Sequence, residues 1–497
     1  MVEAQILQGA RVYRHGEDCD VPPIADVLLN GTRIAAVGPR GSFDADAQGA
    51  QRIDLSGHLL IPGFVNAHYH SFDTLAKGAF ESMPLDDWAM TVIPVAGAMN
   101  LEQIRLRTLA GAIECLRNGI TTTQDFCILS PMDEARVDAV LDAYSEAGLR
   151  VILSIAVRDR SQLATTPWAE ELVPKHLQHV FGDKADGGEF QLQFVRRQID
   201  RIGDQDDMVI WALSPVAPQR CSDSLLAGIA DLAMQRNLPI YTHVYETRGQ
   251  RVFAKHLYSQ FGGSQIRQME SLGLLGPHVT IAHGVWPDQS EIKLLAQSGT
   301  GVVLNMMSNL RLRSGVAPIQ AYRRLGVRLA LGCDNCSCSD VQSMFQAMKL
   351  YCLMGGIAEA TTAGPLASEA MRLATAGGAH TAAQSHSLGA IEPGRRADLV
   401  ALDLSDPAYR PLNSAVRQVV YADSGRSVRH VWVNGKQVVR NGRSTLVDEQ
   451  QLASQLEQIM PAYRRELERR RLEMTPLKPV LTEIHRRSWA HELDLDE

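Results

Sequence analysis

The sequence predicts an α/β protein, a (β/α)8 TIM-like barrel joined to a small β-sandwich domain built from both chain ends. Three observations lead to this fold class. Between residues 60 and 335, strand-like apolar runs alternate with helical runs, which is typical of parallel sheets. Both ends of the chain instead carry short strand-like runs with Asn-Gly turns. The length of 497 residues allows a barrel and further structure beside it.

The first sixty residues predict short strands, with Asn30-Gly31 as a hairpin turn. The same pattern returns late in the chain, where Asn434-Gly435 marks a second hairpin. Each end alone offers too small a sheet to be stable, which favours one β domain made from both. The expected strands cover residues 4–13, 25–29, 33–37, 51–60, 397–402, 428–433 and 436–440.

The middle of the chain predicts eight strand-helix units. The expected strands are residues 60–67, 120–125, 150–157, 209–214, 239–243, 279–283, 301–305 and 328–333. The expected helices are residues 101–118, 133–147, 189–202, 222–236, 250–272, 288–297, 317–325 and 341–353, several with a capping residue such as Asn100 or Ser222. The expected domains are residues 1–60 and 388–447 for the β-sandwich, 61–387 for the barrel and 448–497 for a charged, helical extension.

The composition points to an ordinary globular protein with a small-molecule partner. Forty-nine basic and 56 acidic residues give a net charge of −7, which favours neither nucleic acid nor a membrane surface. There is no apolar run of about 18 residues and no secretion-type start, so a cytoplasmic location is expected. Cys333, Cys336 and Cys338 lie close together, but no second Cys or His pair completes a thiolate zinc site.

Candidate metal ligands lie where barrel strands end. His68 and His70, at positions i and i+2, share one face of the first strand, and imidazoles are good ligands for first-row metals. His243 and His283 end the fifth and sixth expected strands, and Asp334 follows the eighth. A single strand-end histidine is more often structural. Four strand ends carrying such residues at the same mouth of a barrel indicate a metal site.

These segments resemble the metal-dependent amidohydrolase superfamily. The similarity is strongest to the branch of triazine hydrolases, guanine deaminases and S-adenosylhomocysteine deaminases, and it runs from the first strands to Asn434-Gly435. The matching segments are residues 62–70, 119–125, 243–246, 281–286, 308–315, 332–334 and 388–400. The resemblance implies a small-molecule substrate and a homodimer or higher homo-oligomer.

The resemblance also implies a role for each site residue. His68, His70, His243 and Asp334 match the metal ligands of mononuclear members. Glu246 matches the proton shuttle, and His283 matches the histidine beside the metal-bound water and substrate. Binuclear members add a carboxylated lysine at the end of the fourth strand, and residues 209–214 contain no lysine. One divalent ion per chain is therefore expected, zinc first and iron second.

The implied activity is hydrolytic deamination of an amino-substituted N-heterocycle. Three imidazoles and a carboxylate leave a coordination position for water, whose pKa a divalent ion lowers. That water attacks the ring carbon while Asp334 takes its proton. Glu246 protonates the ring nitrogen, His283 stabilises the intermediate, and ammonia or an amine leaves. This is a hydrolase acting on carbon-nitrogen bonds other than peptide bonds.

Two alternatives stay open. The same site is suited to displacing chloride or to opening an amide or carbamate, and no residue decides between these bonds. A non-catalytic scaffold, as among dihydropyrimidinase-like proteins, is disfavoured because the ligand set is complete.

The substrate pocket is predicted less fully. Trp88, in the expected lid loop, and Asn309, near the seventh strand, are candidate substrate-binding residues, with loop packing and turn stabilisation as the alternatives. In nucleoside-deaminating relatives, histidines typically stand where this chain has Val216 and Leu304. A ribose-bearing substrate is therefore expected less than a smaller or more apolar one.

Overall fold

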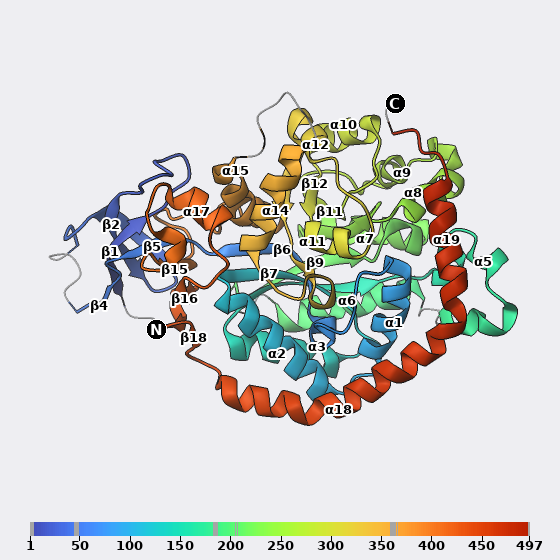
Figure 1. The fold of residues 1–497 in the computed structure, drawn as a ribbon, viewed down its shortest axis with the longest axis horizontal. Coiled ribbons are helices and arrows are strands. Elements are labelled where there is room, and N and C mark those ends of the chain that lie inside the picture. Colours follow the sequence, from blue (N-terminus) through green and yellow to red (C-terminus); the bar gives the residue numbers. More distant parts are fainter. Residues whose placement is uncertain are drawn as a thin grey trace.

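Eight parallel strand positions form the central barrel (Figure 1). The structure is a computed structural model, and it describes residues 4–43, 49–181, 187–203, 205, 207–357, 364 and 366–495. Neighbouring strands pair in chain order from β6 to β13, and β14 then pairs in parallel with β6, which closes the ring and confirms the predicted barrel. The strands are β6 (Phe64–His70), β7 (Ile120–Cys127), β8 (Arg150–Val157), β9 (Val209–Pro215), β10 (Ile240–Val244), β11 (Val279–His283), β12 (Gly301–Leu304), β13 (Arg328–Leu331) and β14 (Asp334–Asn335).

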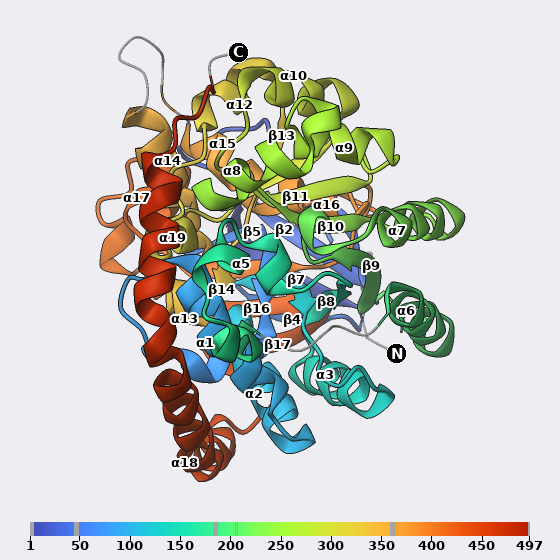
Figure 2. The same ribbon diagram turned by 90° about the vertical axis from the view of Figure 1, so that its right-hand side faces the viewer.

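Helices surround these strands as an outer ring (Figure 2). The side chain of Asn100 accepts a hydrogen bond from the Gln103 amide, forming a capping box that begins α2. The ring and its connections include α2 (Leu101–Arg117), α3 (Glu134–Ala147), α4 (Gln162–Thr165), α5 (Ala169–Leu172), α6 (Gly188–Ile202), α7 (Asp223–Arg236), α10 (Gln289–Ser298), α11 (Met306–Arg311), α12 (Ile319–Leu325), α13 (Cys336–Ser339), α14 (Met344–Ile357), α15 (Ala367–Arg372) and α16 (Gly378–Thr381).

Two helical segments differ from the sequence prediction. The single helix expected over residues 250–272 is divided into α8 (Arg248–Leu257) and α9 (Gln265–Ser271). Gly262 and Gly263 lie between them with φ of +66° and +77°, a conformation that ends a right-handed helix. The expected lid loop around Trp88 contains a helix, α1 (Leu85–Gly97).

Both chain ends build one β-rich domain beside the barrel, at the left of Figure 1. The N-terminal and C-terminal parts meet where β5 pairs antiparallel with β15. Asn434 and Gly435 both have positive φ, as a type I′ hairpin turn requires. The strands are β1 (Gln5–Val12), β2 (Ile24–Asn30), β3 (Arg33–Pro39), β4 (Gln51–Asp54), β5 (His58–Pro62), β15 (Leu399–Asp403), β16 (Val428–Val433), β17 (Lys436–Arg440) and β18 (Arg443–Ser444), with the short helix α17 (Ala415–Tyr421) beside them.

A buried ion pair joins the barrel to this domain. Arg150, at the start of β8, contacts the carboxylate of Asp398, just before β15, and both side chains are almost fully buried. The second carboxylate oxygen of Asp398 accepts a hydrogen bond from the Asn434 amide at 2.8 Å. The pair therefore ties the barrel wall to the hairpin of the β-rich domain.

The C-terminal residues form two helices that curve along the lower and right-hand sides of the barrel in Figure 1, α18 (Glu449–Met474) and α19 (Lys478–Ala490). Arg464 and Arg465 are exposed, as expected for a solvated charged face. Arg470 is not part of that face. It is buried and donates to the backbone oxygens of Met90 and Val180, each at 2.8 Å.

α19 also anchors a loop at the mouth of the barrel. The guanidinium of Arg248, which begins α8, donates to the backbone oxygens of Ser488 at 3.0 Å and His491 at 2.7 Å. It lies 5.1 Å from the ring centre of Trp286 and 5.5 Å from that of Trp489. These contacts join the loops after β10 and β11 to the last helix.

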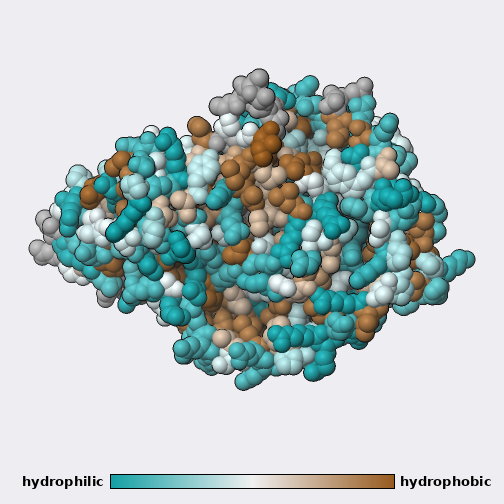
Figure 3. Space-filling view, in the orientation of Figure 1, coloured by the Kyte–Doolittle hydropathy of each residue, from teal (hydrophilic) through white to brown (hydrophobic). Residues whose placement is uncertain are grey.

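The outer surface is mostly hydrophilic on the face shown in Figure 3, with hydrophobic residues gathered near the middle. Exposed apolar side chains on and beside α14 include Leu353, Ile357 and Leu366. Within the described part of the chain, no helix combines the length and the apolar character needed to cross a bilayer.

We expect Arg150→Met to lower the free energy of unfolding by about 3–5 kcal/mol, because it leaves the Asp398 carboxylate buried without its cation. Urea titration measures this change. The matched control is Arg201→Met, which removes an exposed pair with Asp138 and should change stability by about 1 kcal/mol or less. An equal, small loss in both variants would contradict the structural role of the buried pair.

Candidate active site

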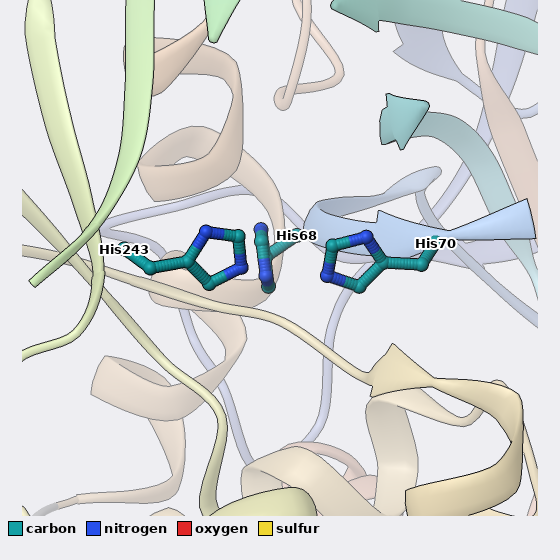
Figure 4. Close-up of side chains that lie close together, drawn as sticks. All are labelled: His68, His70 and His243. Atoms are coloured by element: carbon teal, nitrogen blue, oxygen red, sulfur yellow. The ribbon is translucent and has the colours of Figure 1, made fainter. Parts of the chain in front are cut away.

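Three histidines converge at the carboxyl end of the barrel strands (Figure 4). His68 and His70 come from β6, where alternate side chains share a face, and His243 comes from β10. The ring centre of His68 lies 4.7 Å from that of His70 and 4.8 Å from that of His243. The three side chains therefore point at one position from different directions.

Hydrogen bonds behind the rings set which nitrogen faces this position. Nδ1 of His70 lies 2.9 Å from the Phe126 carbonyl oxygen, and Nδ1 of His243 lies 2.7 Å from that of Val216. A carbonyl oxygen only accepts, so both Nδ1 atoms carry a hydrogen, and Nε2 is the atom of each neutral ring that offers a lone pair. Such bonds orient metal-binding imidazoles.

Asp334 completes the group from β14. Its Oδ1 lies 3.2 Å from Nε2 of His70 and 3.5 Å from Nε2 of His68. Its Oδ2 accepts a hydrogen bond of 2.5 Å from Ser308. Among the described side chains, Nε2 of His68 and Oδ1 of Asp334 are buried polar atoms without a hydrogen-bond partner.

This donor set fits a divalent metal ion. The ligand atoms of His68, His70 and His243 lie within 4.8 Å of one another, as do those of His68, His283 and Asp334. Imidazole nitrogens with a carboxylate oxygen are ligands that zinc and other first-row metals favour. A cation at their centre would pair the two unsatisfied atoms.

The electrostatics of the cluster favour metal-binding protonation states. Burial, with the neighbouring His283 and His70, lowers the pKa of His243 to about 3. Burial also lowers the pKa of His68. Burial alone would raise the pKa of Asp334, but its bond to His70 and the surrounding imidazoles hold it well below the usual value. The pKa of His70 is raised, because the effect of the neighbouring Asp334 carboxylate outweighs that of burial. A cation bound at His70 would therefore displace a proton.

Glu246 and His283 lie beside this cluster. Nε2 of His283 is 3.7 Å from Oε2 of Glu246 and 3.8 Å from Oδ2 of Asp334. Burial, with the negative charges of Asp334 and Asp86, raises the pKa of Glu246 well above its usual value. A carboxyl whose protonated form is favoured in this way is suited to donate a proton to a bound ligand.

Asn309 holds His283 rather than lining the cavity. Its Oδ1 lies 2.7 Å from Nδ1 of His283. His283 itself has φ of +72°, an uncommon conformation for a residue other than glycine. The side chain predicted to touch substrate thus contacts the histidine from behind.

The backbone that carries Glu246 is fixed by a buried network. The preceding residue, Tyr245, has φ of +50° and donates its hydroxyl hydrogen to Glu291 at 2.8 Å. The same hydroxyl accepts hydrogen bonds from Arg251 at 2.7 Å and from the Gln265 amide at 2.8 Å. These contacts hold a strained backbone that aims Glu246 into the site.

A cavity that opens to solvent extends from the cluster. Trp88 lines it and donates from Nε1 to Ser337 at 2.8 Å, so it both packs the lid and faces the cavity. Val216 lines the cavity, whereas Leu304 is buried in the main core and is absent from the lining. The apolar lining includes Phe72, Leu85, Ile93, Phe126 and Ile128, and the polar lining includes Asp86, Gln162, Gln219, Arg220 and Gln250.

Comparisons with known proteins match this geometry. Residues 59–438 match the model of the amidohydrolase family. A 5-methylthioadenosine/S-adenosylhomocysteine deaminase of Syntrophobacter fumaroxidans is 30% identical, over 85% of this chain and 89% of the relative. A 5'-deoxyadenosine deaminase of Methanopyrus kandleri is also 30% identical, over 84% of this chain and 90% of the relative. The chain belongs to the amidohydrolase family.

Solved structures of similar fold include two with bound zinc. An adenosine deaminase from Xanthomonas campestris is 26% identical with a TM-score of 0.79, covering 93% of this amidohydrolase and 98% of that chain. An atrazine chlorohydrolase from Arthrobacter aurescens is 24% identical with a TM-score of 0.81, covering 92% and 100%, and shows the shared fold. As an amidohydrolase, the protein is a hydrolase of carbon-nitrogen bonds other than peptide bonds, in a family that uses a divalent metal.

Sequence reasoning missed several residues around the site of this amidohydrolase. Gln124, in the middle of β7, lies 3.2 Å from Nδ1 of His68, and no local motif marks such a position. Asp86, at the start of α1, and Arg220, in a short helix after β9, line the cavity from segments whose course the sequence pattern does not reveal. Cys333, Cys336 and Cys338 are buried free thiols, and none belongs to a possible metal-binding group among the described residues.

Proposed function

We propose that this amidohydrolase is a metal-dependent hydrolytic deaminase that removes an amino group from an N-heterocycle and releases ammonia or an amine. One observation supports this most strongly. A buried carboxyl with a raised pKa, Glu246, lies 3.7 Å from His283 at the edge of the histidine-aspartate cluster. Attack on a ring carbon builds negative charge on the neighbouring ring nitrogen, and this carboxyl can supply the proton that neutralises it.

One divalent ion, held by His68, His70, His243 and Asp334, is part of the proposal. Zinc is the first choice and iron the second. β9, where a bridging lysine would be required for a second ion, has the sequence VIWALSP and contains none. When bound, the ion supplies a water of lowered pKa as the nucleophile.

The protein's own groups handle the protons. Asp334, held ionised by the imidazoles around it, accepts a proton from the attacking water. Glu246 donates a proton to the ring nitrogen next to the attacked carbon, and the proton accepted by Asp334 passes to the amino group as its bond to that carbon breaks. His283, fixed by Asn309, hydrogen-bonds the incoming oxygen. Trp88 offers a flat apolar surface for the ring.

The remaining proposals concern the substrate, the cellular location and the oligomeric state. We propose a small heterocyclic substrate as its partner and a cytoplasmic location. A homodimer or larger homo-oligomer is supported by the exposed apolar side chains of Leu353, Ile357 and Leu366.

Metal content tests the ligand assignment. We expect about one divalent ion per purified chain, because four protein ligands fill one site. Chelation should abolish turnover, and added zinc should restore it. Elemental analysis measures the ratio. A ratio near two would contradict a mononuclear site.

Two variants separate proton transfer from metal binding. Glu246→Gln should retain its metal and lose turnover by about a hundredfold or more, as expected for a missing general acid. His243→Ala should lose the metal as well. Metal analysis beside ammonia-release assays checks both. A metal-free Glu246→Gln protein would make Glu246 a ligand instead.

A substrate panel tests the expectation about ribose. With Leu304 in the core, the expectation now depends on Val216, whose apolar side chain offers no hydrogen bond to a hydroxyl. We expect adenosine and S-adenosylhomocysteine to show lower kcat/KM than some non-ribosylated aminopyrimidine, purine, pterin or triazine. Either nucleoside at about 10⁴ M⁻¹s⁻¹ or above would overturn this expectation. Chloride or amine release in the same panel tests the alternative bond types.

A further inference from the structure

One arginine side chain, that of Arg220, is among the residues that line the cavity. Arg220 ends the short helix η3 (Pro218–Arg220) after β9 and lines the cavity. Its Nε donates to the Arg160 backbone oxygen at 3.2 Å. Its own backbone oxygen accepts from the amides of Asp159 and Arg160 at 3.2 and 3.0 Å. The side chain is therefore anchored at its base and at Nε.

The outer end of this guanidinium has no protein partner in the described part of the chain. Neither terminal nitrogen makes a hydrogen bond, and no carboxylate lies at ion-pair distance. Arg220 is half-buried, and three fully buried arginines have partners: Arg150 is paired with Asp398, Arg251 with Glu291, and Arg470 with two backbone oxygens. Burial and the nearby Arg158 lower the pKa of Arg220 to about 9, which reflects a cation held without enough compensation.

A carboxylate stands elsewhere on the same cavity lining without pairing with Arg220. Asp86, at the start of α1, lies 3.4 Å from Nε2 of Gln162. Burial, with repulsion from Asp87, raises the pKa of Asp86 to about 6, although Arg220 opposes the shift. The two opposite charges thus act on each other across a space in the cavity. This part of the cavity therefore offers a carboxyl group from Asp86 and hydrogen-bond donors from Arg220.

We propose that Arg220 is a specificity-determining residue that binds an acceptor oxygen of the substrate, a ring oxo group or a carboxylate, on the part of the substrate remote from the amino group that leaves. The inference rests on the proposed deaminase function and narrows its substrate class to oxygen-bearing aminoheterocycles. A guanidinium presents its donors in a planar fork that matches a carboxylate, and one arm suits a carbonyl. A ring without such an oxygen would displace water and leave these donors unpaired.

Matched substrates and variants test the proposal. The first series is 4-aminopyrimidine, its 2-oxo derivative and its 2-carboxylate. The second pair is 5'-methylthioadenosine and S-adenosylhomocysteine, which differ by an amino-acid tail. Arg220→Met removes the fork, and Arg220→Lys keeps the charge alone. Arg196→Met is the control, because Arg196 is exposed on α6 and its loss changes the net charge by the same amount.

We expect wild-type enzyme to prefer an oxygen-bearing member over its parent on the order of tenfold to a hundredfold in kcat/KM. Arg220→Met should abolish this preference, Arg220→Lys should keep part of it, and Arg196→Met should keep all of it. The oxo and carboxylate members show which oxygen is bound. A preference unchanged in Arg220→Met, or absent from the wild type, overturns the inference.

Calorimetric binding separates this inference from the proposed function. If no compound releases ammonia, the deaminase proposal fails for this panel, and dissociation constants still test Arg220. Tighter binding of an oxygen-bearing ring that is lost in Arg220→Met supports the subsite. Equal binding by both proteins refutes it. Metal content and a circular dichroism spectrum equal to those of the wild type show that Arg220→Met is folded. If Arg220→Met misfolds, Arg220→Lys takes its place in the binding measurement.

Discussion

Closure of the barrel between β14 and β6 is the constraint on which the rest of the site depends. The register places Asp334 opposite Tyr69 and Asn335 opposite His70, so the seam itself brings the carboxylate to the two histidines. Asp73 fixes the turn that follows by accepting hydrogen bonds from the amides of Cys336 and Ser337 at 3.0 and 2.8 Å. A shift of one residue in this pairing would move the side chains of one strand to the other face and separate the ligands.

The site contains several groups whose burial or backbone conformation is unfavourable in free energy, and the surrounding fold must offset that cost. Burial favours the uncharged imidazoles of His68 and His243 and the protonated form of Glu246, whereas the surrounding imidazoles favour the ionised form of Asp334. Tyr245, His283 and Asp334 also have positive φ. Shifted pKa values and strained backbone gather at sites where chemistry occurs, and here the stable barrel and the Glu291 network hold them in place.

The strand ends were readable from sequence because barrel topology sends all of them to one mouth. His68, His70, His243 and Asp334 therefore needed only their positions on strands for their convergence to be predicted. Side chains on loops were not readable in this way. Asn309, a candidate for substrate binding or for turn stabilisation, contacts His283, while Leu304 was expected near the pocket and lies in the core.

The misses share a physical cause. Arg220 stands beyond a strand end, where three-dimensional folding of the loop, rather than periodicity, decides what a side chain faces. The break between α8 and α9 was present in Gly262-Gly263, but the helical pattern on both sides obscured it. Local sequence predicted regular elements well, and contacts between distant loops required the structure.

The contact between α19 and Arg248 has a consequence for biosynthesis. The loop that carries Glu246 is secured by the backbone oxygens of Ser488 and His491, which are added to the chain long after Glu246. Likewise, one edge of β5 is paired only after β15 has been synthesised. Pairings so distant along the chain form late and slowly. The strands that carry His68, His70 and His243 are thus synthesised before the segment that secures the loop after β10, so the contacts of that loop are completed last.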